Sequence, residues 1–277
     1  MQKGINVAIA QTSCKVADKK TNIERMKKGI KQAKEKAANI VIFPELSLTG
    51  YVCKDLTYEL AEPVPGPSTR LIEKEASRND IHIIFGMLER STKAGAVLYN
   101  TAVLIGPDGF VGKYQKAHLP THSVFEEKRY FRPGYAAPIF KTEIGNLGMI
   151  ICYDIYFPEI TRLLRLQGAQ LIACISASPS VRRGFFEVLT AARAMENTVF
   201  LAFANLAGIE DGLQFWGGSR IIAPSGSIIR QAKYDEEDLI MARIDYADLE
   251  RVEVFVPALR DLRPEFFNKL EKLAETL

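Results

Sequence analysis

Three residues capable of acyl-transfer chemistry stand at the ends of apolar, strand-like segments. Glu45 follows the run IVIFP, Lys116 follows GFVGKYQ, and Cys152 follows LGMII. A side chain at the carboxyl end of a buried strand is held at the edge of an α/β fold where ligands bind. A carboxylate can take the proton of a thiol, and an ammonium stabilises the negative charge that develops when the sulfur attacks a carbonyl. The three residue types together predict acyl transfer.

Each of these residues also has an ordinary structural interpretation when it is taken alone. A lone cysteine is more often a small buried hydrophobic residue than a nucleophile. An acid after a proline commonly begins a helix, and a lysine before a loop is commonly solvated. Cys174, inside the run LIACISAS, is assigned the buried role, and Cys14 and Cys53 are interpreted as structural cysteines. The catalytic interpretation therefore depends on the sequence around all three positions.

The segments that must position these residues alternate between two patterns. Short runs rich in Val, Ile and Phe predict strands, and stretches with helical spacing occupy residues 19–38, 66–79, 157–168 and 183–197. Two segments, LIGPDGFVGKY and IIAPSGSIIRQ, place a Pro-x-Gly turn between strand-like runs and predict antiparallel hairpins. We therefore expect an α/β fold, a four-layer α-β-β-α sandwich with two mixed β-sheets packed face to face and helices outside.

The sequence contains no linker rich in Pro, Gly and Ser, so we expect one domain over residues 1–277. The last residues, PEFFNKLEKLAETL, have the spacing of an amphipathic helix. We expect residues 252–277 to form a C-terminal tail that contacts another subunit, with packing against its own domain as the alternative.

Composition and charge argue against several kinds of partner. The 36 Lys and Arg residues nearly balance 33 Asp and Glu residues, and no block of like charge suggests a nucleic-acid or membrane surface. Four scattered cysteines and three histidines predict neither a metal site nor a disulfide framework. The N-terminal apolar run is shorter than that of a signal peptide, and no run approaches the roughly 18 apolar residues of a membrane span. We therefore expect a soluble cytoplasmic protein.

Three segments around the candidate residues resemble the signatures of the nitrilase (carbon–nitrogen hydrolase) superfamily. They are FPELSLTGY, KYQKAHLP and GMIICYDIYFPE, in the family's order and at its separations. The resemblance continues through ARAMEN, AFANLAG and FWGGSRIIAPSG and so covers nearly the whole chain. It implies hydrolysis of a non-peptide carbon–nitrogen bond without a metal or organic cofactor, and assembly as a homodimer or higher homo-oligomer.

The resemblance also implies a role for each candidate residue. Glu45 would be the general base, Lys116 would stabilise the tetrahedral intermediate, and Cys152 would be the nucleophile that forms a thioester. Glu127, in VFEEKRYFRPG, matches an additional glutamate that the family keeps near the lysine, and the adjacent Glu126 is the alternative.

Four further residues are expected around the substrate. The backbone N–H of Tyr153 would complete an oxyanion hole with Lys116, and Phe43 and Tyr51 would shape the floor of the pocket. Tyr156 stands where many carbamoyl hydrolases and ω-amidases carry an arginine that pairs with a substrate carboxylate. A phenol cannot supply that bidentate charged pairing. The segment SPSVRRGFF offers two candidates to replace the arginine, Arg182 and Arg183.

Family branches differ in the residues that follow the nucleophile. True nitrilases typically continue Cys-Trp-Glu, whereas this chain reads Cys152-Tyr153-Asp154, as amidases and carbamoyl hydrolases do. The segments PELSLTGYVCKDL and KAHLPTHSVFEEKRYFRPG look most like the glutaminase domain of glutamine-dependent NAD synthetase. We expect no synthetase domain within these 277 residues, and CYDIYFPE departs from that branch's CEDxW.

We therefore expect an amidase that releases ammonia from a small linear amide through a cysteine thioester. The alternatives are an N-carbamoyl amino acid or ureido hydrolase and a stand-alone glutaminase subunit that feeds ammonia to a synthetase partner. A non-enzymatic interaction module is the least favoured, because all four candidate catalytic side chains are intact.

Overall fold

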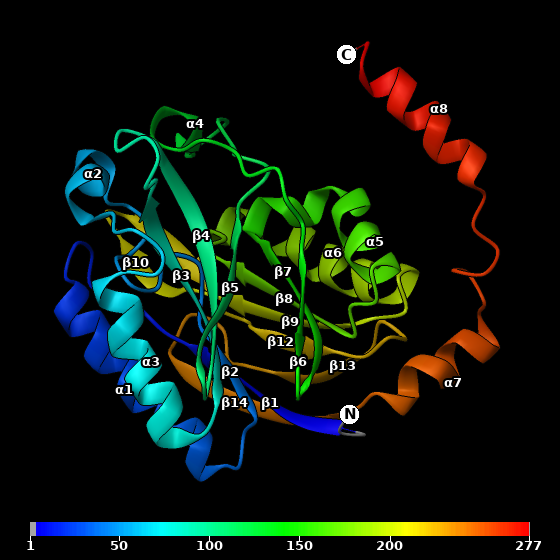
Figure 1. The fold of residues 1–277 in the computed structure, drawn as a ribbon, viewed down its shortest axis with the longest axis horizontal. Helices are drawn as coiled ribbons and strands as arrows, with labels where there is room; N and C mark the ends of the chain where they lie inside the picture. The colour runs from blue at the N-terminus through cyan, green and yellow to red at the C-terminus, as the bar shows by residue number, and fades with distance from the viewer. Residues whose placement is uncertain (1–3, 277) are drawn as a thin grey trace.

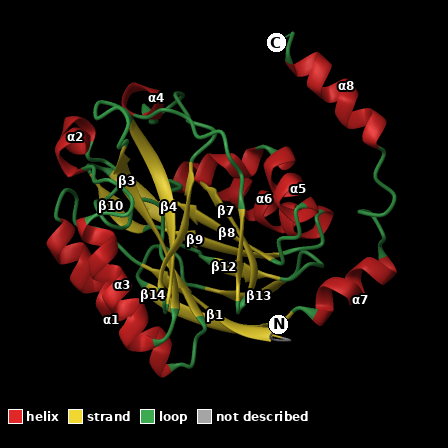
Figure 2. Cartoon of the chain, viewed as in Figure 1, coloured by secondary structure: helices red, strands yellow, loops and turns green. Residues whose placement is uncertain are grey.

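Two mixed β-sheets of six strands each form the centre of the protein (Figures 1 and 2). The computed structural model describes residues 4–276. In the first sheet β1, β2 and β3 run parallel, and the remaining neighbours are antiparallel. Its strands, in spatial order, are β14 (Asp238–Asp245), β1 (Gly4–Gln11), β2 (Ile40–Ile42), β3 (His82–Arg90), β4 (Leu98–Gly106) and β5 (Gly109–Gln115).

The second sheet repeats this arrangement with β7, β8 and β9 parallel and the other neighbours antiparallel. Its strands, in spatial order, are β13 (Ile228–Gln231), β12 (Arg220–Ile222), β9 (Phe200–Asn205), β8 (Leu171–Ser176), β7 (Gly145–Ile151) and β6 (Ile139–Thr142). A separate two-stranded hairpin is formed by β10 (Ala207–Glu210) and β11 (Leu213–Trp216).

Helices cover the outer faces of both sheets (Figure 1). The first sheet is covered by α1 (Lys19–Glu35) and α3 (Pro67–Asn79), and the second by α5 (Pro158–Leu166) and α6 (Arg183–Glu196). The shorter elements are η1 (Lys54–Leu56), α2 (Thr57–Leu60), α4 (Glu127–Tyr130), η2 (Cys152–Tyr156) and η3 (Ser180–Arg182).

The side-chain alternation of the strands divides the core into layers. In β2, Ile40 and Ile42 point into the space between the sheets, whereas Val41 packs with the helices of the first sheet. Successive residues of a strand point to opposite faces, so a strand covered on both faces reads as a continuous apolar run. The predicted four-layer α-β-β-α sandwich is confirmed.

The predicted elements agree closely with the observed ones. The four predicted helices correspond to α1, α3, α5 and α6, each within a few residues of the predicted ends. The two Pro-x-Gly segments form the antiparallel pairs β4–β5 and β12–β13. The hairpin β10–β11 was not predicted.

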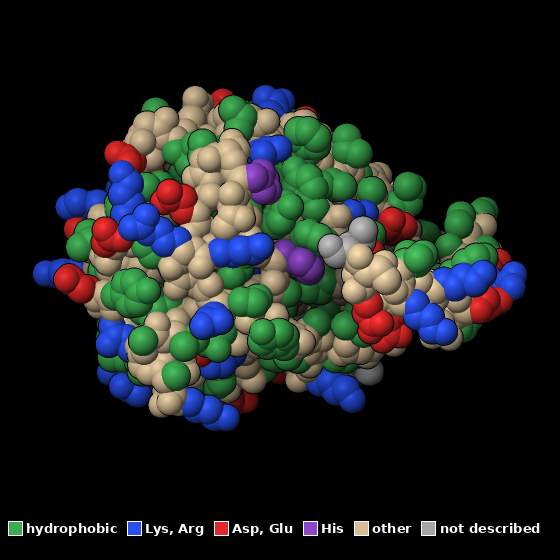
Figure 3. Space-filling model, turned by 90° about the horizontal axis from the view of Figure 1, so that it is seen from above, with side chains coloured by type: hydrophobic (Ala, Val, Ile, Leu, Met, Phe, Trp, Pro, Cys, Tyr) green, Lys and Arg blue, Asp and Glu red, His purple; other side chains and the backbone are tan. Residues whose placement is uncertain are grey.

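The C-terminal segment contains α7 (Ala247–Phe255), which contacts the sandwich through the buried Leu249 and through Glu253, 2.6 Å from Arg165 of α5, and α8 (Pro264–Ala274), which projects from it (Figure 1). Every residue of α8 is exposed, and Figure 3 shows this segment extending to one side with hydrophobic side chains among its charged ones. An amphipathic helix in the tail is confirmed, and contact with another subunit remains a prediction. The outermost residues of the predicted domain, 1–3 and 277, lie outside the described part. Among residues 4–276, no helix has both the length and the apolar character needed to cross a membrane.

Candidate active site

Cys152 lies at the turn that ends β7. The residue has a positive φ of 47°, which places it in the left-handed region that non-glycine residues rarely occupy. The Asp154 carboxylate holds the turn, because its Oδ2 accepts hydrogen bonds from the Ile151 backbone N–H at 3.0 Å and from the Tyr114 hydroxyl at 2.8 Å. Such strained residues are concentrated at functional sites. The sharp turn presents the thiol at the carboxyl end of the strand, as the sequence predicts.

Glu45 follows β2 and is fully buried between the two sheets. Its Oε1 accepts hydrogen bonds from Asn100 Nδ2 and from Lys116 Nζ, each at 2.7 Å. Its Oε2 accepts one from the backbone N–H of Ala177, just beyond β8, at 2.7 Å. These donors come from both sheets, so the carboxylate is fixed in orientation and joins the sheets at their carboxyl ends.

Gly86 in β3 allows the backbone around Glu45 to approach this closely. A Cβ atom at position 86 would lie 2.2 Å from the Leu46 backbone nitrogen and 2.9 Å from the Glu45 Cα. Both contacts are with backbone atoms, which cannot move aside without moving Glu45. A glycine is therefore required here by the position of the carboxylate.

Lys116 is buried between two carboxylates. Its Nζ lies 2.7 Å from Glu45 Oε1 and 2.7 Å from Glu127 Oε1, and the side chain has no exposed surface. Burial opposes the charge on Lys116, but the carboxylates of Glu127 and Glu45 outweigh this effect and raise its pKa. The ammonium therefore remains charged at neutral pH.

Glu127 contacts the same ammonium as Glu45, and its pKa is raised. Burial is the main cause that raises its pKa from 4.5 to about 7, the Glu45 charge acts in the same direction, and Lys116 opposes both. The Tyr51 hydroxyl donates to Glu127 Oε1 at 2.7 Å, while Oε2 has no partner within residues 4–276. The neighbouring Glu126 is exposed. The structure therefore brings Glu127, and not Glu126, to the lysine.

The Cys152 thiol is buried beside these charges. Burial and the Glu45 carboxylate raise the pKa of Cys152 well above its ordinary value, and the Lys116 ammonium lowers it only in part. The thiol is consequently protonated in the resting site. It needs a base to become a nucleophile, and Glu45 is the carboxylate whose charge acts on it most strongly.

A narrow, mostly aromatic pocket leads to the thiol. Its free volume is about 10 Å³, near the minimum that holds one water molecule. This volume admits only a small reacting group unless side chains move. The walls are formed by Cys152, Pro120, His122, Phe125, Tyr153, Tyr156, Ser178, Arg182 and Phe186.

The two candidate arginines differ in position. Arg182 lines the pocket with Cys152 and makes no ion pair in the described part of the chain. Arg183 instead pairs with Glu187 at 3.1 Å, and its guanidinium lies 3.6 Å from the centre of the Tyr234 ring. Arg182 is therefore the arginine that a substrate in the pocket would meet.

The remaining predicted residues are only partly brought together. Tyr153 and Tyr156 line the pocket, and Tyr51 lies behind Glu127. The assignment of Phe43 to the pocket floor is wrong: its ring packs against Gly29 of α1, on the helix side of the first sheet. Phe43 has the same parity as Val41 along the chain and therefore points away from the inter-sheet side.

Several residues of the site were missed by sequence reasoning. Asn100 is a polar residue inside an apolar strand, which is a detectable signal, because buried polar groups are retained where they are hydrogen-bonded. Glu210 gave no such signal. This buried residue of β10 accepts hydrogen bonds from the backbone N–H groups of Tyr51 and Val52 at 2.8 and 3.0 Å, and so holds the loop that carries Tyr51.

The sequence is similar to known proteins along nearly its whole length. It is 32% identical to a probable nitrilase from Schizosaccharomyces pombe over 96% of this chain and 98% of the relative. It is 34% identical to an omega-amidase from Xenopus tropicalis over 92% of this chain and 94% of the relative. It is also 33% identical to a glutamine-dependent NAD(+) synthetase from Aquifex aeolicus, covering 89% of this chain but only 43% of that protein.

Solved structures show the same fold. A carbon–nitrogen hydrolase from Helicobacter pylori superimposes with a TM-score of 0.90 at 26% identity, over 97% of this chain and 98% of that one. A mutant of the amidase from a Nesterenkonia species superimposes with a TM-score of 0.84 at 25% identity, over 97% and 98% of the two chains. That structure shows covalent addition of the acetamide moiety of fluoroacetamide at the active-site cysteine.

The sequence model of the family described as carbon–nitrogen hydrolase matches residues 6–253, which include every candidate catalytic residue. With the sandwich fold and relatives above 30% identity over nearly the full length, this match shows that the chain belongs to the carbon–nitrogen hydrolase family.

Proposed function

We propose that this carbon–nitrogen hydrolase is an amidase that releases ammonia from a small linear amide through a thioester on Cys152. The observation that supports this proposal is the buried group of Glu45, Lys116 and Glu127, whose charges all act on the one thiol that lines the pocket. The group supplies a base, a fixed cation and a nucleophile in a space with little water, which are the requirements of acyl transfer.

In the first half of the reaction, Glu45 takes the proton of the thiol, and the Cys152 sulfur attacks the carbonyl carbon of the amide. The Lys116 ammonium and the backbone N–H of Tyr153 stabilise the negative charge that develops on the carbonyl oxygen. Glu45 then gives its proton to the nitrogen as the carbon–nitrogen bond breaks, and ammonia leaves. The product of this half is a thioester. The cysteine adduct in the Nesterenkonia amidase supports this assignment of the nucleophile.

In the second half, Glu45 takes a proton from a water molecule, and the resulting hydroxide attacks the thioester carbonyl. The carbon–sulfur bond breaks, the carboxylic acid is released, and the proton on Glu45 returns to the sulfur. Glu127 keeps Lys116 in position through both halves, because its Oε1 and that of Glu45 hold the ammonium from two sides. Each cycle consumes one amide and one water.

Two polar groups in the wall of the pocket favour an amide that ends in a carboxylate. Arg182 lines this pocket without an ion-pair partner in residues 4–276, and the buried hydroxyl of Tyr156 has no hydrogen-bond partner among them. A guanidinium and a hydroxyl together can bind one carboxylate, the arginine through two parallel hydrogen bonds. The omega-amidase relative from Xenopus supports this substrate class.

The reaction is tested by measuring ammonia released from short aliphatic amides, glutamine, asparagine and N-carbamoyl amino acids. The Cys152→Ala protein is the blank. Turnover of at least one simple amide by the natural chain, with none by the variant, is the expected result. Turnover confined to N-carbamoyl amino acids would replace the proposal with a carbamoyl hydrolase, and turnover confined to glutamine would replace it with a glutaminase.

The substrate class is tested separately with succinamate and butanamide, which differ in having a carboxylate or a methyl group at the far end. We expect Arg182→Gln to lower kcat/KM for succinamate by about 10²-fold and to leave butanamide within a few-fold, because a charged hydrogen-bonded pair contributes roughly 1.5–3 kcal/mol. Arg183→Gln is the matched control. An equal effect of Arg182→Gln on both substrates would refute a carboxylate-binding role.

A further inference from the structure

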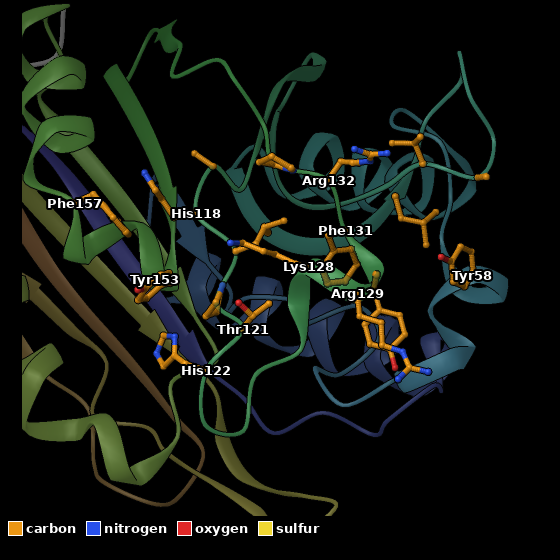
Figure 4. Close-up of a pocket in the computed structure, with 18 residues that line it drawn as sticks. Tyr58, His118, Thr121, His122, Lys128, Arg129, Phe131, Arg132, Tyr153 and Phe157 are labelled. Atoms are coloured by element: carbon orange, nitrogen blue, oxygen red, sulfur yellow. The ribbon is translucent and has the colours of Figure 1, made fainter. Parts of the chain in front are cut away.

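A second and much larger hollow lies beside the pocket of Cys152 (Figure 4). Its volume is about 870 Å³, whereas the narrow pocket that leads to Cys152, called the nucleophile pocket below, has a volume of about 10 Å³. The two share Pro120, His122 and Tyr153 in their walls. A concave space of roughly 300–1,000 Å³ is typical of a site for a small molecule. The larger hollow therefore has room for a ligand that the proposed amide hydrolysis does not require.

The charged side chains of this hollow all have one sign. Lys128, Arg129 and Arg132 line it with His118 and His122, and none of its lining residues is Asp or Glu. We call this hollow the basic cleft.

The single sign is a local property of the basic cleft. The chain as a whole has 36 basic and 33 acidic residues. Another hollow, of about 680 Å³, lies between α1 and the start of β14 and has both signs in its wall. Its charged residues are Arg25, Lys28, Lys36, Glu35, Glu237 and Asp238.

Two of the cations in the basic cleft are available to a ligand. Lys128 and Arg132 make no ion pair within residues 4–276, whereas Arg129 lies 3.8 Å from Asp55. Figure 4 shows the Lys128 side chain reaching across the cleft toward His118 and Tyr153. Like charges gathered on a concave wall repel one another and raise the local concentration of anions. An anion between them would relieve that repulsion.

One wall of the basic cleft is rigid. The His118 ring stacks on Phe157, with ring centres 3.6 Å apart and planes within 8°. Its Nδ1 lies 2.8 Å from Oδ1 of the fully buried Asp154, which also accepts a hydrogen bond from the His118 backbone N–H at 2.9 Å. Because Nδ1 is engaged, Nε2 is the ring nitrogen left for a ligand. Because these contacts fix the orientation of the ring, a ligand that packs against it does not lose the entropy of ordering it.

From these observations we propose that the basic cleft binds a small phosphate-bearing molecule. A phosphoryl group brings a charge near −2 and three acceptor oxygens, so a wall that carries three cations and no acid attracts it more strongly than it attracts a single carboxylate. The concave shape fits a small molecule, whereas a nucleic acid would need an extended basic track along its backbone. The proposal does not rest on the amidase activity, because it concerns binding outside the nucleophile pocket.

The proposal is tested by calorimetry on the Cys152→Ala protein, so that turnover plays no part. The probes are pyrophosphate, AMP, adenosine and succinate, at fixed ionic strength. We expect pyrophosphate and AMP to bind with dissociation constants below about 1 mM, and adenosine and succinate to bind at least 10-fold more weakly. Comparison of AMP with pyrophosphate separates a nucleotide from a free phosphate as the ligand.

Two double variants with the same loss of charge separate the basic cleft from general attraction. Lys128→Gln with Arg132→Gln should weaken pyrophosphate binding at least 10-fold. Lys31→Gln with Arg70→Gln, exposed residues of α1 and α3, should leave it unchanged. All four substitutions are of exposed side chains, and equal unfolding midpoints verify the fold. Absence of pyrophosphate and AMP binding, equal weakening by both pairs, or equally tight succinate binding would overturn the proposal.

Discussion

The burial of Glu127 beside the charge of Glu45 makes protein stability depend on pH in a specific way. The pKa of Glu127 is raised from 4.5 to about 7 by burial. Below about pH 4.5 the carboxyl is protonated in both the folded and the unfolded chain. Between about 4.5 and 7 only the unfolded chain releases the proton, so the folded state binds more protons and its stability falls as pH rises. Above about 7 the loss is complete.

The size of this effect follows from the difference between the two pKa values. One unit of pKa corresponds to about 1.4 kcal/mol, so the free energy of unfolding falls by about 3 kcal/mol across the window because of Glu127. Glutamine has the same shape but no proton to lose. As the pH rises from 4.5 to 8, the free energy of unfolding of Glu127→Gln should therefore increase by about 3 kcal/mol relative to that of the natural chain. This corresponds to about 6–10 °C in Tm for a chain of this size.

Urea unfolding at pH 4.5, 5.5, 6.5 and 8 measures this difference directly. The comparison between the two proteins cancels the titration of all other groups that the substitution leaves unaffected. The exposed neighbour provides the control, since Glu126→Gln removes the same charge one residue away. If the difference in free energy of unfolding between Glu127→Gln and the natural chain were the same at every pH, burial would not raise the pKa of Glu127.

Three further substitutions test the remaining parts of the site. Lys116→Ala leaves two buried carboxylates without their cation. We expect the free energy of unfolding in urea at pH 8 to fall by about 3–5 kcal/mol. The rate of ammonia release should fall by about 10²–10³-fold. Gly86→Ala places a Cβ atom 2.2 Å from the Leu46 nitrogen, so it should lower the free energy of unfolding by about 1–3 kcal/mol and lower kcat. Gly95→Ala, whose Cβ atom would lie in open space, should change neither the free energy of unfolding nor kcat. Cys152→Ala should unfold like the natural chain and form no acyl adduct detectable by mass spectrometry, and an adduct on the variant would place the nucleophile elsewhere.

The positions of the principal side chains could be predicted because each one ends an apolar run. A strand that is buried on both faces has few polar residues until it leaves the sheet, so a polar residue that ends an apolar run commonly marks the sheet edge. This reasoning placed Glu45 and Cys152 correctly at the ends of β2 and β7. The same lack of alternation explains the error at Phe43. In the run IVIF all four residues are apolar, and nothing in their pattern distinguishes the inter-sheet face from the helix face.

The residues that support the site could not be predicted, because their partners are distant in the sequence. Glu210 accepts a hydrogen bond from the backbone N–H of Tyr51, which is 159 positions away in the sequence. Gly86 is required only because the loop after β2 crosses it. The turn Asp211–Gly212 between β10 and β11 is the common signal of a tight hairpin. That signal identifies the hairpin, but not the loop against which it packs.

The bonds of the Glu45 carboxylate have a consequence for the order of events during folding. Its partners Lys116 and Ala177 lie 71 and 132 positions along the chain, on different sheets. Contacts between such distant positions close large loops and form late. A refolding chain should therefore recover its circular dichroism spectrum before its thiol becomes reactive toward an amide. A partly folded chain should not hydrolyse amides.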